Sequence, residues 1–341
     1  MSRRIYWITV SSATLLIGIF LGHWLATSNG PQKIILTKIH PKNISFKFIQ
    51  PLLGIELTTK GGFLKELQPL KKEVEKTFWQ KKQDQEVNSI SYYFFDLNTS
   101  RWTGFSENDQ FDPASLLKVP IMIAYLKRAE TNPDLLTTKI PFKVPSSTNN
   151  PFLESELNDS VIKPGQTYTV DELIKIMIQN SDNVAKGLLL KLLEEQPALI
   201  SWKDLNDIFS YLGININNNR DKDLVISART YSIFLRLLYN ANYLDYASSE
   251  KALELLSRSA FKDGIVAGVP KNITVANKFG FYDADENGKL VTPELHDCGI
   301  VFHPQNPYLI CIMTKGNDPS HLKDFIKTLS KITYDFVEKN F

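Results

Sequence analysis

Residues 88–97, "NSISYYFFDL", predict a β-strand near the start of the folded part of the chain. The run is rich in aromatic and β-branched residues, which are favoured in strands, and it ends at "NTS", a turn sequence. Residues 101–107, "RWTGFSE", follow the turn and form a plausible partner strand. The sheet therefore begins with two neighbouring strands, after which the sequence pattern becomes helical.

Helices and further strands flank this pair of strands in the sequence. An apolar stripe, interrupted early by Pro69, predicts a helix over residues 63–82. The capping box "TVDE", residues 169–172, opens another helix, and Ser227 is a candidate N-cap. Further helices are expected from near Ser115 and over residues 170–180, 183–196, 228–244, 248–259 and 320–341, and late strands over residues 274–282, 289–293, 296–303 and 307–316.

The order of these elements predicts the fold class. Strands lie at both ends of the domain, and a block of helices lies between them. Each strand needs hydrogen-bonded neighbours and each apolar face needs a covering layer. We therefore expect an α/β (α+β) sandwich over residues 62–341, in which an antiparallel sheet is formed by both ends of the domain.

Residues 5–26, "IYWITVSSATLLIGIFLGHWLA", contain no Asp, Glu, Lys or Arg and predict a transmembrane helix. At about 1.5 Å per residue the run can cross a hydrocarbon core of about 30 Å. The arginines at positions 3–4 favour a cytoplasmic N-terminus. We expect a single-pass anchor in the cell membrane at residues 1–28, then an extracytoplasmic spacer at residues 29–61 and an extracytoplasmic folded domain. A signal peptide cleaved near Ala26 is the alternative.

Composition excludes several classes of function. The chain has 341 residues and a net charge of +2, from 39 basic and 37 acidic residues, which gives no indication of a nucleic-acid partner. Cys298 and Cys311 are its only cysteines and build no zinc pattern. Both lie in apolar runs, so two buried free thiols are favoured. A disulfide between them remains the alternative. We expect no cofactor and a monomer.

Residues 111–120, "FDPASLLKVP", place Ser115 and Lys118 one helical turn apart. Side chains at i and i+3 share a helix face, so Lys118 can reach the Ser115 hydroxyl. Apolar neighbours would lower the pKa of Lys118 by desolvation, and a neutral amine can take the serine proton. Unpaired N–H groups at the helix N-terminus would stabilise an oxyanion. Alone, the pair also fits an N-cap serine and a lysine that extends to solvent.

Two further motifs follow in the sequence. Residues 181–183, "SDN", lie between two apolar helices, where a loop can present a hydroxyl and an amide to a cleft. Taken alone they equally fit a helix stop followed by a new N-cap. Residues 278–280, "KFG", lie on a predicted strand, where a lysine can hold a carboxylate while glycine admits close approach of the substrate. Their ordinary interpretation is an edge-strand lysine beside a bulge glycine.

Together and in this order, the three motifs resemble the class A β-lactamase and penicillin-binding-protein superfamily. The signature of that superfamily is S-x-x-K, S-D-N and K-T-G. The context is similar too, because S-x-x-K opens a helix after two strands, S-D-N joins two helices, and the lysine triad lies on a late strand. The resemblance covers residues 62–341 and implies the β-lactamase/transpeptidase-like fold.

The resemblance also implies roles for individual residues. Ser115 would be the nucleophile that accepts the acyl group, and Lys118 the base or proton relay. Ser181 would pass a proton to the leaving nitrogen and contact Lys278. Asn183 would hydrogen-bond the amide side chain of the substrate, and Lys278 would supply positive charge for the substrate carboxylate.

The substrate-binding residues Gly280 and Phe281 complete the implied site. The backbone N–H groups of Ser115 and Phe281 would form the oxyanion hole. The sequence departs from the family pattern at Phe279, which replaces a hydroxyl residue that would donate to the substrate carboxylate. It departs again at residues 212–229, "LGININNNRDKDLVISAR", which contain no glutamate to activate a deacylating water. The aspartates there, Asp221 and Asp223, are better explained as solvated loop charges.

We therefore expect a membrane-anchored serine β-lactamase-like hydrolase that acts through an acyl-enzyme on β-lactams. The alternatives are a D-alanyl-D-alanine peptidase or penicillin-binding protein acting on peptidoglycan peptides, and a catalytically silent module that binds the cell wall. An intact Ser115, Lys118, Ser181 and Lys278 argue against the silent module, because binding needs neither a base nor a relay.

Two other patterns in the chain suggest different chemistry. Asp283, Asp285, Asn287, Gly288 and Glu294 match the EF-hand calcium pattern, but both flanks are strand-like rather than helical. We expect a hairpin connection there and no metal. The adjacent residues 296–297, "HD", would face opposite sides of a strand, so a structural role is expected for at least one of them.

Overall fold

The structure, a computed structural model, describes residues 46–50, 65–143, 157–214, 224–284 and 290–341. The predicted anchor at residues 1–28 lies outside the described residues, as do Asp221, Asp223 and residues 285–289. Among the residues that are described, no helix is long and apolar enough to cross a membrane. Of the predicted spacer, residues 46–50 lie against the folded domain, where Glu250 accepts hydrogen bonds from the backbone N–H groups of Lys47, Phe48 and Ile49.

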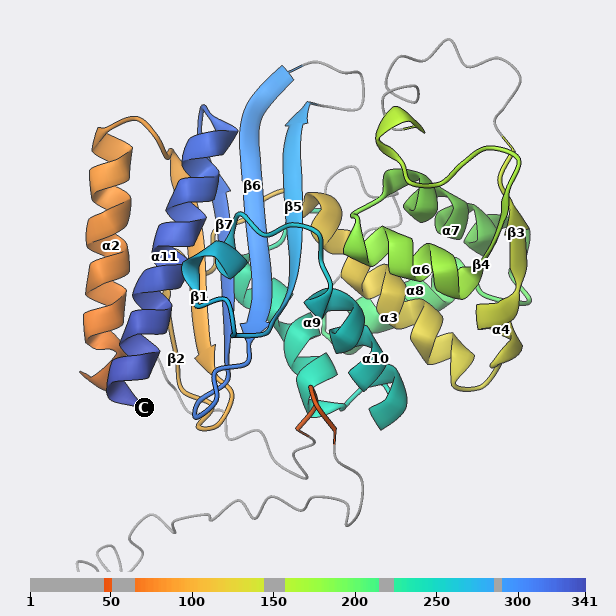
Figure 1. Ribbon diagram of the computed structural model, residues 1–341, viewed down its shortest axis with the longest axis horizontal. Helices are drawn as coiled ribbons and strands as arrows, with labels where there is room; N and C mark the ends of the chain where they lie inside the picture. The colour runs from red at the N-terminus through yellow and green to blue at the C-terminus, as the bar shows by residue number, and fades with distance from the viewer. Residues whose placement is uncertain (1–45, 51–64, 144–156, 215–223, 285–289) are drawn as a thin grey trace, which may run out of the picture. The chain divides into compact units, whose positions relative to one another are not determined.

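A five-stranded sheet in the order β2-β1-β7-β6-β5 forms the centre of the domain (Figure 1). All four neighbouring pairs are antiparallel. The early strand β1 pairs with the last strand β7, so both ends of the domain build one sheet, as the element order predicted. The strands are β1 (Ser89–Asp96), β2 (Trp102–Phe105), β5 (Val275–Ala284), β6 (Leu290–Val301) and β7 (Tyr308–Lys315).

The sheet is covered on both faces, which explains why its central strands are apolar on both sides. Two helices cover one face, α2 (Gln68–Gln83) and α11 (Pro319–Asn340), drawn in orange and dark blue in Figure 1. Phe94, Ile310 and Phe325 belong to the core between them and the sheet. The helical block covers the other face, where Cys298, Leu309 and Met313 join its core.

The helical block supplies the second half of the sandwich. Thr169 and Glu172 form the predicted capping box at the start of α6, and the Ser227 side chain caps α9 as predicted. The block consists of α3 (Lys118–Ala129), α4 (Asp134–Thr137), α6 (Val170–Gln179), α7 (Asn183–Glu195), α8 (Trp202–Tyr211), α9 (Ala228–Asn240) and α10 (Tyr246–Ser257), with a small sheet of β3 (Lys139–Pro141) and β4 (Thr167–Thr169).

Within the described ranges, three short 3-10 helices and one long strand refine the predicted elements. The 3-10 helices are η1 (Lys65–Leu67), η2 (Ala114–Leu117) and η3 (Ile265–Gly268). The two strands expected over residues 289–293 and 296–303 are replaced by the single strand β6, Leu290–Val301, which carries Pro293 near its start. β5 ends at Ala284 and β6 begins at Leu290, so the "DADENGK" segment connects two antiparallel strands.

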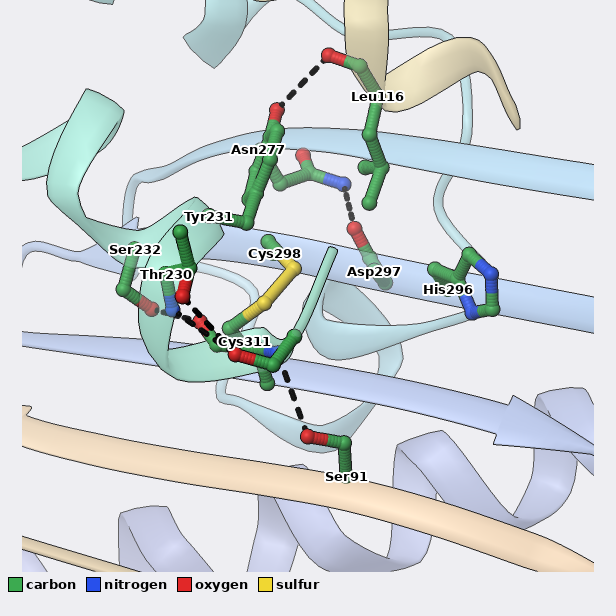
Figure 2. Close-up of a disulfide and its surroundings, with 12 residues drawn as sticks. Ser91, Leu116, Thr230, Tyr231, Ser232, Asn277, His296, Asp297, Cys298 and Cys311 are labelled. Atoms are coloured by element: carbon green, nitrogen blue, oxygen red, sulfur yellow. Dashed lines mark hydrogen bonds between the residues drawn. A yellow bond between two sulfur atoms is a disulfide. The ribbon is translucent and has the colours of Figure 1, made fainter. Parts of the chain in front are cut away.

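The prediction of two free thiols was wrong, because Cys298 and Cys311 form a disulfide. The two residues are register partners on the antiparallel strands β6 and β7, which brings their Cα atoms to 3.9 Å. Figure 2 shows the disulfide between the sheet and the start of α9. The sequence could not reveal this, because pairing depends on strand register rather than on composition.

Candidate active site

Ser115 lies in the 3-10 turn η2, directly before α3. Pro113 precedes the turn, and its carbonyl accepts a hydrogen bond from the Leu116 N–H at 2.9 Å. Ala114 adopts a left-handed backbone conformation, with φ +46°. For a residue other than glycine this conformation costs about 1–3 kcal/mol. The nucleophile candidate is therefore presented on a strained turn rather than inside a regular helix.

Pro120 is accommodated because α3 starts later than the sequence suggests. A helix starting at Ser115 would lose the hydrogen bond between Pro120 and Leu116. Because α3 begins at Lys118, Pro120 falls in its first turn. The first four N–H groups of a helix have no partner within the helix, so the missing donor costs little there.

Lys118 is completely buried and lies at the centre of the site. Its Nζ donates to Ser115 Oγ at 2.9 Å, to Asn183 Oδ1 at 2.7 Å and to Ser181 Oγ at 3.2 Å. The Ser181 backbone carbonyl is a further acceptor. An amine in contact with the Ser115 hydroxyl can exchange a proton with it, which is the first requirement of a general base.

The S-D-N segment caps one helix and also contacts Lys118. Asp182 is the N-cap of α7 and accepts from the Ala185 N–H at 2.8 Å, so the N-cap interpretation holds for this residue. Ser160 Oγ donates to the same carboxylate at 2.7 Å and fixes the turn. Ser181, at φ +56°, and Asn183 flank the cap and contact Lys118. The strained turn thus directs two polar side chains towards one lysine.

Lys278 approaches the same serine from the sheet. It lies on β5, is completely buried, and donates from Nζ to Ser181 Oγ at 2.8 Å and to the Phe279 carbonyl at 2.9 Å. Burial lowers the pKa of Lys278 well below its ordinary value, and the charge of Lys118 lowers it further, while the carboxylate of Asp297 acts in the opposite direction. The hydroxyl of Ser181 therefore lies between two lysines, one of which gives up a proton readily.

Gly280 is required by the packing of the nucleophile turn against β5. A Cβ atom at this position would lie 2.9 Å from the Pro113 carbonyl oxygen and 3.2 Å from Leu116 Cγ. The predicted reason for this glycine was close approach of the substrate, whereas the close approach that the structure shows is that of the turn itself. Phe281, two-fifths exposed at 38%, follows it at the outer end of the strand. Its backbone role in an oxyanion hole stays a prediction.

Phe279 lies on the opposite face of the strand from Lys278. Its ring stacks on Phe261, with ring centroids 4.3 Å apart and planes 22° apart. Lys278 Nζ is 4.4 Å from the centre of the Phe279 ring. This position therefore carries an aromatic ring that packs on Phe261, and it has no hydroxyl donor.

Sequence reasoning missed several residues that hold the site together. Tyr231 Oη donates to the Leu116 carbonyl at 3.2 Å (dashed line in Figure 2). Glu294 and His296 both hydrogen-bond the backbone of Asp112, three residues before Ser115. Their alternation on one strand was visible in the sequence, but only the pairing of β5 with β6 places that face beside the turn.

Of the calcium pattern, only Asp283 and Glu294 lie among the described residues. Glu294 Oε1 pairs with Lys315 Nζ at 2.8 Å, and its other oxygen accepts from the Asp112 backbone N–H. Across the described residues no group of three or more His, Cys, Asp or Glu is arranged to hold a metal ion. Asp297 and His296 point to opposite faces of β6, as expected: Asp297 accepts from Asn277 and from the Ile265 N–H, while His296 contacts Asp112.

Solved structures share this fold. PBP-A, in a mutant solved as its acyl-enzyme complex with penicillin G, matches with a TM-score of 0.63 and 22% identity, over 80% of this chain and 97% of that chain. A class A β-lactamase from Mycobacterium abscessus matches with a TM-score of 0.63 and 22% identity, over 79% and 99%. A β-lactamase from Xanthomonas campestris matches with a TM-score of 0.62 and 18% identity, over 79% and 98%. No curated protein sequence matches this chain.

A sequence-family comparison identifies the family. The profile described as "Beta-lactamase enzyme family" matches residues 69–337, which include the sheet, the helical block and every residue of the candidate site. The fold, the order of the three motifs and this match agree. The chain belongs to the beta-lactamase enzyme family.

Proposed function

We propose that the protein is an extracytoplasmic serine hydrolase that is acylated at Ser115 by β-lactams and hydrolyses them. The observation that carries this proposal is the contact of 2.9 Å between Lys118 Nζ and Ser115 Oγ. This contact is part of a buried chain of polar groups that continues through Ser181 Oγ to Lys278 Nζ. A catalytically silent binding module has no need of such a chain.

The chain of polar groups suggests how acylation proceeds. Lys118, as the free amine, takes the proton of Ser115 while Oγ attacks the carbonyl carbon of the lactam. The tetrahedral intermediate collapses as the carbon–nitrogen bond breaks. Ser181 Oγ gives its proton to the leaving nitrogen and recovers one from the neighbouring lysines, so that no net proton is gained or lost. The product is an ester between Ser115 and the acyl group.

One observation favours a second candidate, a penicillin-binding protein that acts on peptidoglycan peptides. Residues 212–229 lack the glutamate that would activate water for deacylation. Acylation by a β-lactam would then be followed by slow release, and the peptide substrate would be the natural one. Both candidates use Ser115 as the nucleophile, so they differ only in deacylation, the step that releases the acyl group from Ser115.

Membrane anchoring and location outside the cytoplasm are part of the proposal. The apolar run at residues 5–26 and its preceding arginines support a single-pass anchor. The disulfide between Cys298 and Cys311 supports an oxidising compartment, because such bonds persist outside the cytoplasm. We propose a monomer with its catalytic domain on the outer side of the cell membrane.

One experiment separates these functions. The full chain in detergent is incubated with a chromogenic β-lactam, and hydrolysis and intact mass are followed together, with Ser115→Ala as the control. Continuous turnover identifies a β-lactamase. A stable adduct on Ser115 without turnover identifies a penicillin-binding protein. The absence of an adduct in both proteins would refute the hydrolase proposal.

A further inference from the structure

Two buried residues of β6 hold the segment that precedes the nucleophile. Glu294 is 6% exposed and His296 is 0% exposed, and both lie on the same face of the strand. Glu294 Oε2 accepts from the Asp112 N–H at 3.2 Å, and His296 Nε2 lies 2.8 Å from the Asp112 carbonyl oxygen. Both backbone polar groups of Asp112 are therefore bound to the sheet, across more than 180 residues of sequence.

The hydrogen bonds of His296 determine which of its nitrogens carries the proton. The Thr314 N–H points at Nδ1 at 3.2 Å, so Nδ1 must accept. Nε2 then carries the proton and donates to the Asp112 carbonyl, which can only accept. The Phe111 ring packs edge-on against the imidazole, with centroids 5.5 Å apart, and fixes its plane.

Glu294 is a buried carboxylate that forms an ion pair with Lys315. Burial alone would raise the pKa of Glu294, but His296, whose Nε2 lies 3.5 Å from Oε2, and Lys315 outweigh it and lower the pKa below its ordinary value. Lys315, on β7, provides the ion pair at 2.8 Å. The carboxylate is thus kept ionised where it accepts the Asp112 N–H, and a charged acceptor makes the stronger hydrogen bond.

The hold on Asp112 is transmitted to the strained turn. Asp112 Oδ1 accepts from the Ala114 N–H at 2.7 Å, and Ala114 is the residue with φ +46°. On the other side of the turn, Pro113 packs against Gly280. The turn that presents Ser115 is therefore held at Asp112 by β6 and at Pro113 by β5. A strained conformation persists only where its surroundings determine it in this way.

We propose that Glu294 and His296 are positioning residues for Ser115, which set the geometry of the Ser115–Lys118 contact by fixing Asp112. Neither residue takes part in the chemistry. The proposal rests on the proposed role of Ser115 as nucleophile, because positioning affects the acylation step of that role. A purely structural role would instead lower the stability of the fold and leave the acylation rate of the folded protein unchanged.

Paired substitutions at one position separate these two roles. His296→Gln keeps a donor near the position of Nε2 and so keeps the bond to Asp112. His296→Asn keeps only a group near Nδ1, for Thr314, and loses that bond. Glu294→Gln keeps an acceptor for the Asp112 N–H without the charge. The matched control is Glu250→Gln, because Glu250 accepts the backbone N–H groups of residues 47–49 in the same manner, on a different part of the domain.

The first measurement is the acylation rate of the full chain with a fluorescent penicillin, read together with the apparent binding constant and the melting temperature. A displacement of about 1 Å at a reacting group costs about 100-fold in rate. We expect His296→Asn to acylate about 10- to 100-fold more slowly with its binding constant nearly unchanged, Glu294→Gln to be intermediate, and His296→Gln to stay near wild type. Equal rates in His296→Asn and wild type would overturn the proposal, as would equal losses in the Asn and Gln variants.

A second measurement does not depend on activity. Amide hydrogen exchange of the peptide that contains Asp112, Ala114 and Ser115 reports the hold on the turn directly. We expect faster exchange in His296→Asn than in His296→Gln, and no change in Glu250→Gln. Unchanged exchange in His296→Asn would refute the positioning role. If wild type forms no adduct, the proposed function fails, and this measurement alone decides whether β6 fixes the turn.

Discussion

The β1–β7 and β5–β6 strand pairs of the sheet differ in the kinds of side chain that they bury. The β1–β7 pair runs without a register shift from Ser89 to Asp96, and Phe94, Ile310 and Ile312 are all completely buried. The β5–β6 pair has a register shift between Tyr282 and Ala284. This second pair buries four acidic or basic side chains, Lys278, Glu294, His296 and Asp297, whereas the β1–β7 pair buries one carboxylate, Asp96, at its end.

The difference shows where the stability of the fold and the function of the site are located. Apolar burial stabilises the first pair by about 25 cal/mol per Å². Burial of ionisable groups in the second pair carries a desolvation cost that their hydrogen bonds offset only in part. Substitutions of apolar residues in the first pair should therefore lower stability and leave the reaction unchanged, whereas substitutions in the second pair should change the reaction or the pH dependence of stability.

The largest expected effect is on the reaction. Ser115→Ala should reduce formation of the β-lactam adduct by about 1,000-fold or more, because it removes the hydroxyl that lies 2.9 Å from Lys118 Nζ and that accepts the acyl group in the proposed reaction. The melting temperature should stay close to wild type, since only one partly buried oxygen is removed. Intact-mass measurement and thermal melting check both statements. An adduct in the variant would show that a residue other than Ser115 is the nucleophile.

The second-largest expected effect is a loss of stability in the apolar β1–β7 pair. Ile310→Ala should lower the free energy of unfolding by about 2–5 kcal/mol, because it leaves a cavity between the sheet and α11. The acylation rate of the protein that remains folded should be unchanged. Urea unfolding and single-turnover acylation measure the two quantities. A large loss of rate in the folded fraction would show that the two halves of the sheet are coupled.

A pH effect of intermediate size is expected from Asp297. Burial raises the pKa of this carboxyl from 3.8 to about 7, although bonds from Asn277 and the Ile265 N–H lower it. The folded state then binds a proton between about pH 4 and pH 7 that the unfolded state has released, so stability falls as pH rises through that window. The fall is on the order of a few kcal/mol.

Asp297→Asn removes this titration. The variant should show a flatter dependence of melting temperature on pH between about 4 and 7 than wild type. Within the described residues, the buried Asn277 Oδ1 has no hydrogen-bond partner, so a flipped Asn277 amide can accept from the new side chain. A pH profile identical to that of wild type would contradict the assignment to Asp297.

The smallest expected effect concerns substrate recognition. Phe279→Thr should raise the acylation efficiency of carboxylate-bearing β-lactams by up to about tenfold, because it restores the hydroxyl donor of the K-T-G motif. It also removes the stacking of Phe279 on Phe261, so a modest loss of stability is expected. Comparison of a β-lactam with its carboxylate ester sharpens the test, since the gain should be confined to the free acid.

Much of the fold was predictable because its signals are local. The aromatic run of β1, the capping box at Thr169 and the Ser227 cap each depend on neighbours within a few residues. The motif residues Ser115, Lys118 and Ser181 were identified by their order in the chain and are brought together in the structure. The boundary of α3 was less predictable, because η2 replaces its first turn.

The sequence by itself determined most of the strands and helices, the order of the three motifs and the absence of a hydroxyl at Phe279, but it did not reveal α4, α8, β3 or β4. Only the tertiary structure decided that Cys298 pairs with Cys311, that Gly280 admits the nucleophile turn, and that Glu294 and His296 hold Asp112. The physical reason is the distance along the sequence over which each kind of interaction acts. Periodicity and capping act over a few residues, whereas these contacts depend on the register of strands that pair after the chain has folded.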